Sequence, residues 1–185
     1  MKIYFTASIV GKKHYLSNYL RIVDYLKNKG NQVISDHIIN TTEDKIRMED
    51  KNERVKFQRT LEDWITSSDV MIAETSFPSI SVGYEISLAA NRGKPILILY
   101  SEGDPPSLLA HHFDDKIICE KYSPDNLEDI LEDFLNFAQG AADTRFTFFI
   151  TSRLALYLEN ISKKKKIPKS VYLRYLIEKD IAKKK

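Results

Sequence analysis

Two short and almost wholly apolar runs constrain the fold of this chain more than any other feature of its sequence. They are VMIAET at 70–75 and PILILY at 95–100. A strand with one face in water alternates polar and apolar side chains, and these two runs do not. Such continuity is typical of the middle of a parallel sheet, where helices cover both faces. We therefore expect a sheet in which these two strands are central.

The segments around these runs predict the rest of the sheet and its helices. Gly30 stands where a glycine commonly ends a helix, and Ser123 followed by Pro124 is typical of a helix start. Strands and helices that alternate at this spacing indicate an α/β fold, namely a doubly wound (flavodoxin- or Rossmann-like) parallel sheet of five strands. The other strands are expected at 2–8, 32–35 and 117–122, and the helices at about 14–29, 48–66, 82–92 and from 123 onward.

A doubly wound sheet also predicts where a ligand binds. Ligands of such sheets lie beyond the carboxyl ends of the strands, near the point where the strand order reverses. The loops that follow the first, third and fourth strands are therefore the candidate binding loops. They cover residues 7–13, 74–83 and 101–108.

The net charge of +2 hides a division of the chain into two parts. Residues 145–185 carry 12 Lys and Arg against 3 Asp and Glu, whereas residues 1–144 carry 16 against 23. The hydrophobic pattern changes at the same place, to one alternating strand at 145–151 and two helices at 152–163 and 168–182. We expect two modules with different partners, one at 1–142 and one at 143–185.

Composition excludes several classes of protein. A hydrophobic fraction of 43% excludes wholesale disorder, and a single cysteine, Cys119, excludes an internal disulfide. No metal site and no cofactor are expected. No apolar run approaches the roughly 20 residues that cross a bilayer, and the chain opens in a strand pattern without a signal peptide. We expect a cytoplasmic protein with no membrane partner.

The loop after the third strand, ETSFPSISVGYE at 74–85, is the most informative segment of the chain. Ser81 is expected to cap the next helix, Gly83 to let a ligand approach the backbone, and Glu85 to lie in the first helical turn. A carboxylate there can stabilise a sugar oxocarbenium ion or attack its anomeric carbon. A first-turn acid also complements the helix dipole, so position alone leaves both interpretations open.

Two separated motifs carry a family resemblance. P-S-x-x-V-G-Y-E at 78–85 followed by G-K-P-I-L-x-L-Y at 93–100 resembles the nucleoside 2-deoxyribosyltransferase-like superfamily. The opening IYFTASI at 3–9 and Ser35-Asp36-His37 are similar to one branch of it, the 2′-deoxynucleoside 5′-phosphate N-hydrolases. The resemblance covers roughly residues 2–140 and implies a nucleotide that binds at a dimer interface.

The resemblance also implies roles for individual residues. Glu85 matches the catalytic carboxylate, and Tyr4 matches the tyrosine that orients it through its hydroxyl. The other matching positions are expected to bind substrate. They contact the 5′-phosphate or the sugar, or lie at the end of the second strand, and the last of them is a serine that reaches the phosphate from a neighbouring subunit. These substrate-binding residues are Ser8, Ile9, Ser79, Gly83, His37 and Ser107.

This sequence departs from the family pattern at two positions. Leu61 occupies the usual place of a second acid, which protonates the leaving base or contacts the sugar, and neither Glu62 nor Asp63 replaces it without a change of helical register. Val10 occupies the place of a phosphate-loop arginine, with Lys12 or Lys13 as the candidate substitutes.

These departures leave two hypotheses for function. The first is a nucleoside 5′-monophosphate N-glycosidase in which Glu85 cleaves the bond between base and sugar, with water or a second base receiving the sugar. The second is a catalytically impaired, nucleotide-sensing regulator that binds DNA. A missing acid favours the second hypothesis, because general acid–base help is worth 10²–10⁴-fold in rate. The intact set of Tyr4, Ser8 and Glu85 favours the first.

Residues 145–185 resemble a ribbon-helix-helix unit, which pairs two chains through a strand and two helices. In its DNA-binding members the paired strands enter the major groove and the second helix meets phosphate. The groove-facing residues here would be Arg145, Thr147 and Phe149, with Ser170 as the phosphate contact. The alternative is a dimerisation unit whose basic face is only solvated.

Overall fold

The computed structural model describes residues 1–48, 50–103, 116–140, 150–165 and 169–183. The chain divides into two compact units, Met1–Thr144 and Arg145–Lys185, and each unit is described by itself. Among the described residues, no helix is long and apolar enough to cross a membrane.

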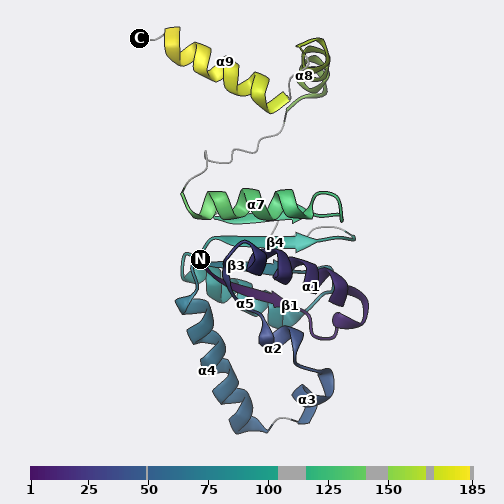
Figure 1. Cartoon of the computed structure of the whole chain (residues 1–185), viewed down its shortest axis with the longest axis vertical. Coiled ribbons are helices and arrows are strands. Elements are labelled where there is room, and N and C mark those ends of the chain that lie inside the picture. Colours follow the sequence, from purple (N-terminus) through teal and green to yellow (C-terminus); the bar gives the residue numbers. More distant parts are fainter. Residues whose placement is uncertain (49, 104–115, 141–149, 166–168, 184–185) are drawn as a thin grey trace. The chain divides into compact units, whose positions relative to one another are not determined.

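The larger unit is built on one five-stranded sheet, which confirms the predicted fold (Figure 1). Its strand order is β2-β1-β3-β4-β5, and all four neighbouring pairs are parallel. The two apolar runs form β3 and β4, both inside the sheet, as their continuous apolar character predicts. The strands are β1 (Lys2–Ala7), β2 (Gln32–Ile34), β3 (Val70–Glu74), β4 (Ile96–Tyr100) and β5 (Ile117–Lys121).

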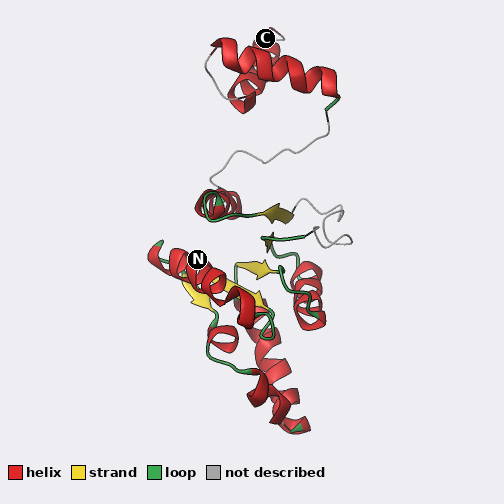
Figure 2. Ribbon diagram, turned by 90° about the vertical axis from the view of Figure 1, so that its right-hand side faces the viewer, coloured by secondary structure: helices red, strands yellow, loops and turns green. Residues whose placement is uncertain are grey.

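Helices cover both faces of this sheet (Figure 2). One core packs the sheet against the first and last helices of the unit, through side chains such as Tyr19 and Phe134. The other core packs the opposite face against the two helices that flank β3, through side chains such as Leu61 and Ile86. The helices are α1 (Lys12–Asn28), α2 (Asp36–Ile39), α3 (Glu43–Met48), α4 (Lys51–Ser67), α5 (Ile80–Asn91) and α7 (Leu127–Ala138).

Strand register brings the candidate loops together. Ala7, the last residue of β1, pairs with Glu74, the last residue of β3, and Glu74 pairs with Leu99 near the end of β4. The loops that follow these strands therefore start side by side at one edge of the sheet. This is the edge at which doubly wound sheets bind ligands.

Two predicted helix starts are wrong. The cap of α5 is Ser79, not Ser81: Ser79 has extended backbone and its hydroxyl accepts from Val82 N at 3.4 Å, so the helix begins at Ile80. Glu85 therefore lies in the second turn of α5 rather than the first. Helix α7 begins at Leu127, because 123–126 form a separate turn in which Ser123 N donates to the Asn126 side chain at 2.6 Å.

The described part of the smaller unit contains two helices, α8 (Ser152–Lys165) and α9 (Lys169–Lys183), close to the two that the sequence predicts. The hydroxyls of Tyr157 and Tyr172 lie 3.2 Å apart across the two helices, and Leu158 is buried. The strand predicted at 145–151 falls mostly outside the described residues. Its last two residues, 150 and 151, are not in a strand.

Candidate active site

A buried tyrosine–glutamate pair lies between β1 and α5. Tyr4 in β1 is fully buried, and Glu85 in α5 is 6% exposed. The Tyr4 hydroxyl donates to Glu85 Oε2 at 3.0 Å across 81 positions of sequence. The structure thus brings together the two residues that the sequence predicts to be catalytic.

Burial sets the protonation of this pair. Burial raises the pKa of Glu85, and the nearby hydroxyls of Thr6 and Tyr4 act against that rise. Burial and the adjacent Glu85 charge raise the pKa of Tyr4 far above its ordinary value. Tyr4 therefore stays protonated at neutral pH, and its hydroxyl remains a hydrogen-bond donor to Glu85.

An aromatic wall continues from this pair. The His37 ring, at the end of β2 in α2, stacks on Tyr4 with centroids 5.1 Å apart and an interplanar angle of 18°. The ring centroid of Trp64 lies 5.1 Å from that of His37. The ring centroid of the partly exposed Phe57 lies 6.4 Å from that of His37, at the rim of this group. Three segments that are remote in sequence thus supply one aromatic wall beside Tyr4. Its rings are not coplanar: His37 and Trp64 are tilted by 38°, and Phe57 and Trp64 by 80°. Faces and edges of this kind both pack against a planar ring.

His37 is a polar group without a partner in this wall. It is 8% exposed, and neither ring nitrogen has a hydrogen-bond partner among the residues that the structure describes. Burial lowers the pKa of His37 to about 4, so the ring is neutral at pH 7. A neutral imidazole offers one donor and one acceptor to a ligand.

The loop after β1 is fixed by short-range contacts. The Ser8 hydroxyl accepts from Gly11 N at 3.1 Å, and Ile9 O accepts from Lys12 N at 3.2 Å. A side chain on Gly11 would place its Cβ 2.6 Å from Phe77 Cβ and 2.8 Å from the Tyr19 hydroxyl. Only glycine fits there, because the loop after β3 presses against the loop after β1.

Ser79 and Gly83 lie at the start of α5, where Gly83 is on the exposed surface of the helix and Glu85 on the buried one. The Ser79 hydroxyl is used as the helix cap. Gly83 has ordinary helical backbone, and an added Cβ would meet nothing within 4 Å. The glycine therefore leaves open space on the exposed surface of the helix, which is compatible with the close approach of a ligand.

The structure also shows what surrounds the two substituted family positions. Leu61 is buried in the core of the α4/α5 face, and Glu62 is turned to an ion pair with Arg92 at 3.7 Å, so it does not replace the missing acid. Lys12 Nζ donates to the carbonyls of Ile39 and Thr41 at 2.7 and 2.8 Å. Lys12 therefore holds the end of α2 in this structure.

Several predicted site residues are not placed. Ser107, Arg145, Thr147 and Phe149 lie outside the described residues, and Ser170 lies in the first turn of α9 with no description of its side chain. In the described part of the chain, no group of three or more His, Cys, Asp or Glu residues is arranged to hold a metal ion.

Sequence reasoning missed two parts of this region. Neither Phe57 nor Trp64 is among the site residues that the sequence predicts, although both lie in the aromatic wall. Glu74, the last residue of β3, is a second fully buried carboxylate. The one available signal for it was an acid at the end of an otherwise apolar strand.

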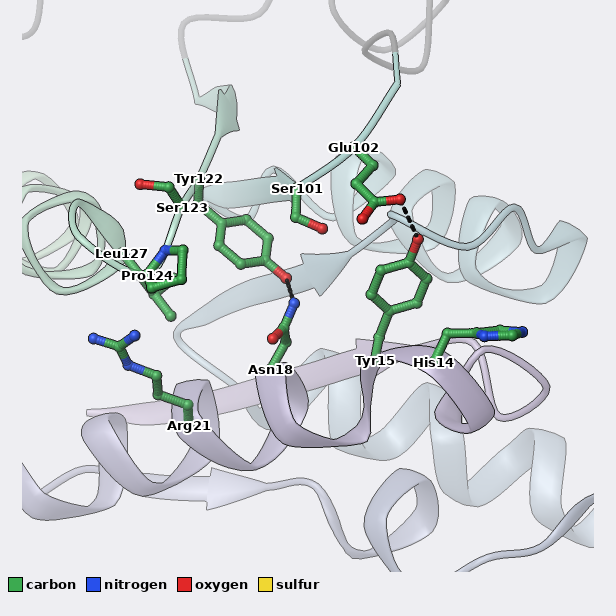
Figure 3. Close-up of a pocket in the computed structure, with 10 residues that line it drawn as sticks. All are labelled: His14, Tyr15, Asn18, Arg21, Ser101, Glu102, Tyr122, Ser123, Pro124 and Leu127. Atoms are coloured by element: carbon green, nitrogen blue, oxygen red, sulfur yellow. Dashed lines mark hydrogen bonds between the residues drawn. The ribbon is translucent and has the colours of Figure 1, made fainter.

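A cavity of about 390 Å³ lies elsewhere on the unit, between α1 and the segments that follow β4 and β5 (Figure 3). Asn18 and Tyr122 form a hydrogen bond at its wall, at 2.9 Å. None of the predicted site residues lines this cavity. It is therefore separate from the Tyr4–Glu85 pair.

Comparison with known proteins agrees with this arrangement. The 5-hydroxymethyl-dUMP N-hydrolase of Tetraodon nigroviridis is 32% identical over 144 residues, which cover 74% of this chain and 98% of that protein. A protein of Syntrophotalea carbinolica, provisionally named 2′-deoxynucleoside 5′-phosphate N-hydrolase 1, is 36% identical over 141 residues, which cover 73% and 94%.

A solved structure supports the same fold. The 2-deoxyribosyltransferase of Bacillus psychrosaccharolyticus superposes with a TM-score of 0.57 at 13% identity, over 79% of this chain and 100% of that chain. The profile of the nucleoside 2-deoxyribosyltransferase family matches residues 3–130, which include every strand of the sheet and the Tyr4–Glu85 pair. This chain therefore belongs to the nucleoside 2-deoxyribosyltransferase family.

Proposed function

We propose that this protein is a nucleoside 5′-monophosphate N-glycosidase in which Glu85 promotes cleavage of the bond between base and sugar. The observation that carries the proposal is the buried hydrogen bond from Tyr4 to Glu85 at 3.0 Å, at the ligand-binding edge of the sheet. The relatives support the substrate class, because one of them is named for hydrolysis of a deoxynucleoside monophosphate.

Glu85 acts on the anomeric carbon of the sugar. As the bond from the base nitrogen to C1′ breaks, its electron pair leaves with the base, and C1′ becomes cationic. The carboxylate of Glu85 stabilises this cation or bonds to it as a glycosyl ester. Water then adds to C1′ and gives the free sugar 5-phosphate, or a second base takes its place in a transfer reaction.

Tyr4 positions that carboxylate. Its hydroxyl donates to Oε2 and holds the side chain of Glu85 against rotation. A hydrogen bond to a charged acceptor is worth about 1.5–3 kcal/mol. The same bond stabilises the ionised form of Glu85, which is the form that reacts, against the effect of burial.

The aromatic wall receives the base. His37, Trp64 and Phe57 supply aromatic faces and edges against which a planar base packs, with Phe57 exposed at the rim. Leu61 cannot protonate the leaving base. We therefore expect faster release of bases that leave easily as anions or take a proton from water than of bases that need an acid.

The phosphate is assigned to the two loops at the sheet edge. Ser8 and Ile9 belong to the loop after β1, and Ser79 with Gly83 begins α5, whose first N–H groups favour an anion. Ser107 of a neighbouring subunit is our candidate for a further phosphate contact.

We also propose that the protein is at least a homodimer and that its basic tail binds DNA. In the smaller unit, Leu156, Ile177 and Ile181 are each more than half exposed, which is compatible with a helical surface that pairs with a second copy. The charge of 145–185, with 12 basic against 3 acidic residues, suits a phosphate backbone. The proposed DNA contacts are Arg145, Thr147, Phe149 and Ser170.

Light scattering at several protein concentrations tests the dimer. Salt titration of DNA binding tests the tail, with Arg145→Ala as the variant. Affinity that persists at about 200 mM salt and needs Arg145 supports a DNA-binding role, because purely phosphate-driven affinity falls steeply with salt. A monomer that does not bind DNA overturns both proposals.

A nucleotide-binding regulator without turnover is the second candidate, and the burial of Leu61 in place of an acid favours it. One experiment separates the two. The full chain is incubated with a panel of ribo- and deoxyribonucleoside monophosphates, and free base is measured by chromatography. Base release that Glu85→Ala abolishes supports the glycosidase. Saturable nucleotide binding without base release supports the regulator.

A further inference from the structure

A second buried glutamate lies behind the proposed site. Glu74 ends β3 and has no exposed surface. Successive residues of a strand point to opposite faces, and Ala73 belongs to the core under α4 and α5. Glu74 therefore faces the other core, under α1 and α7, where Tyr19 and Tyr122 lie. The sheet separates it from Glu85.

Within the described residues, one carboxylate oxygen of Glu74 takes all of its hydrogen bonds. Oε1 accepts from the Tyr122 hydroxyl at 3.0 Å, from the Ser76 hydroxyl, and from Ser76 N at 3.3 Å. Oε2 is buried and has no partner within the described residues. A lone buried oxygen of this kind suits an uncharged acid better than a carboxylate, because an unpaired buried charge is far more costly.

These bonds reach the segments that follow β4 and β5. The Ser76 hydroxyl lies 2.9 Å from that of Ser101, which follows β4, and it accepts from Ser101 N at 2.8 Å. Tyr122 follows β5 and accepts from Asn18 of α1, as Figure 3 shows. Glu74 thus ties the loop after β3 to the segments after β4 and β5 and to helix α1.

The network continues to the loop after β1. The Tyr19 hydroxyl, whose pKa is raised by burial and then by the adjacent Glu74, donates to the Ser8 carbonyl at 3.3 Å. Ser8 in turn holds Gly11 N through its hydroxyl. The two loops that we assign to the phosphate are therefore joined through the surroundings of Glu74.

The groups that face Glu74 carry no positive charge. From α1 they are Tyr15 and Tyr19, and from the segment after β5 the group is Tyr122. Burial raises the pKa of Glu74, and the hydrogen bonds from Ser76 and Tyr122, with the nearby Tyr19 hydroxyl, act against the rise. In the described ranges, no Lys, Arg or His forms an ion pair with it.

We propose that Glu74 is a positioning residue that works as a neutral carboxylic acid and holds the β1–α1 and β3–α5 loops in the shape that receives the 5′-phosphate. The proposal rests on the function assigned to Glu85. A neutral acid suits this place, because a negative charge buried under a phosphate site would repel the ligand in a low-dielectric surrounding. The carbonyl oxygen of the acid is sufficient to accept from the hydroxyls and N–H that it organises.

The test compares Glu74→Gln with Glu74→Ala in the full chain, with Glu128→Gln as a matched change at an exposed ion pair. Glutamine keeps a carbonyl acceptor and stays neutral, so KM and kcat for a nucleoside monophosphate should remain within about threefold of wild type. Alanine leaves the buried donors unsatisfied and should raise KM by about tenfold or more, with a much smaller change in kcat.

Two results would overturn the proposal. If Glu74→Gln raises KM as much as Glu74→Ala does, the negative charge is required and the acid is not neutral. If Glu74→Ala leaves KM unchanged, Glu74 does not position the phosphate loops. Infrared spectroscopy gives a readout that does not depend on the alanine variant folding: wild type at neutral pH should show the C=O band of a protonated carboxylic acid, and Glu74→Gln should lack it. Absence of that band from wild type contradicts the proposal.

Binding calorimetry separates this inference from the proposed function. If wild type binds a nucleoside monophosphate but releases no base, the glycosidase proposal fails, and the dissociation constants of the two variants still test Glu74. Titration with inorganic phosphate should show the same order of affinities, because the proposed effect is on the phosphate. Wild type that neither binds nor turns over any nucleotide overturns both.

Discussion

The two buried glutamates of the larger unit, Glu85 and Glu74, lie on opposite faces of one sheet and differ in what surrounds them. Glu85 accepts from one phenol and adjoins an aromatic wall with an exposed rim. Glu74 has three donors on one oxygen, no exposed surface and only hydroxyl and backbone partners. Burial raises the pKa of both. Burial therefore does not separate the role that we propose for Glu85 from the one that we propose for Glu74; hydrogen-bond partners and access to solvent do.

Apart from the loss of Glu85 itself, the largest effect expected on the face of the sheet that carries Glu85 is a dependence of the free energy of unfolding on pH through His37. The folded pKa of His37 is about 4, against about 6.5 in the unfolded chain. His37 thus contributes stability that is fully present above pH 6.5 and is lost as pH falls toward 4, about 3 kcal/mol in all.

Denaturant unfolding of wild type and His37→Phe between pH 7 and pH 4 measures this contribution. The free energy of unfolding of wild type should fall relative to that of the variant across this window, because phenylalanine does not titrate. Parallel curves for the two proteins would show that His37 is not held neutral beside Tyr4.

Removing the tyrosine hydroxyl that donates to each glutamate sharpens the comparison. Tyr4→Phe removes the hydrogen bond that the Tyr4 hydroxyl donates to Glu85 Oε2 and should lower kcat about 10- to 100-fold, with a small change in KM. Tyr122→Phe removes a donor from Glu74 and should leave kcat nearly unchanged. Tyr25→Phe, which removes a bond to the exposed Glu132, is the control. Equal losses of kcat at Tyr4 and Tyr122 would remove the distinction between the two faces.

The contact between the loop after β1 and the loop after β3, at Gly11 and Phe77, gives a smaller effect, on stability. Gly11→Ala would force its Cβ against Phe77 and the Tyr19 hydroxyl, so we expect the variant to lose about 1–3 kcal/mol of stability. Gly83→Ala is the matched control, since a Cβ there meets nothing and alanine favours a helix. Thermal unfolding measures both. A Gly11→Ala protein as stable as Gly83→Ala would contradict the close packing of the loops.

The sequence predicted the sheet well because its strongest signals are local. Continuous apolar runs identify β3 and β4, and the motifs around Glu85 and Tyr4 identify the family. The start of α5 was predicted two residues too late, because Ser79 and Ser81 are both good caps and only the extended backbone at Ser79 decides between them.

The surroundings of Glu74 were beyond prediction for a different reason. Its partners Ser76 and Tyr122 and the adjoining Ser101 come from the ends of three strands, and no spacing along the chain connects them. The engagement of Lys12 with the end of α2 is likewise visible only in three dimensions. The family motifs thus predicted that Tyr4 and Glu85 form one pair, whereas the contacts around Glu74 join distant segments and have no local pattern.

The most direct test of the difference between the two glutamates is base release from one nucleoside monophosphate by wild type, Glu85→Ala and Glu74→Gln, with Glu62→Ala as an exposed control. We expect Glu85→Ala to lose about 10³-fold or more of kcat, since the group that meets the developing charge is gone. Glu74→Gln and Glu62→Ala should stay within about threefold of wild type. Release by Glu85→Ala at the wild-type rate, or its loss in Glu74→Gln to the same extent, would contradict this account.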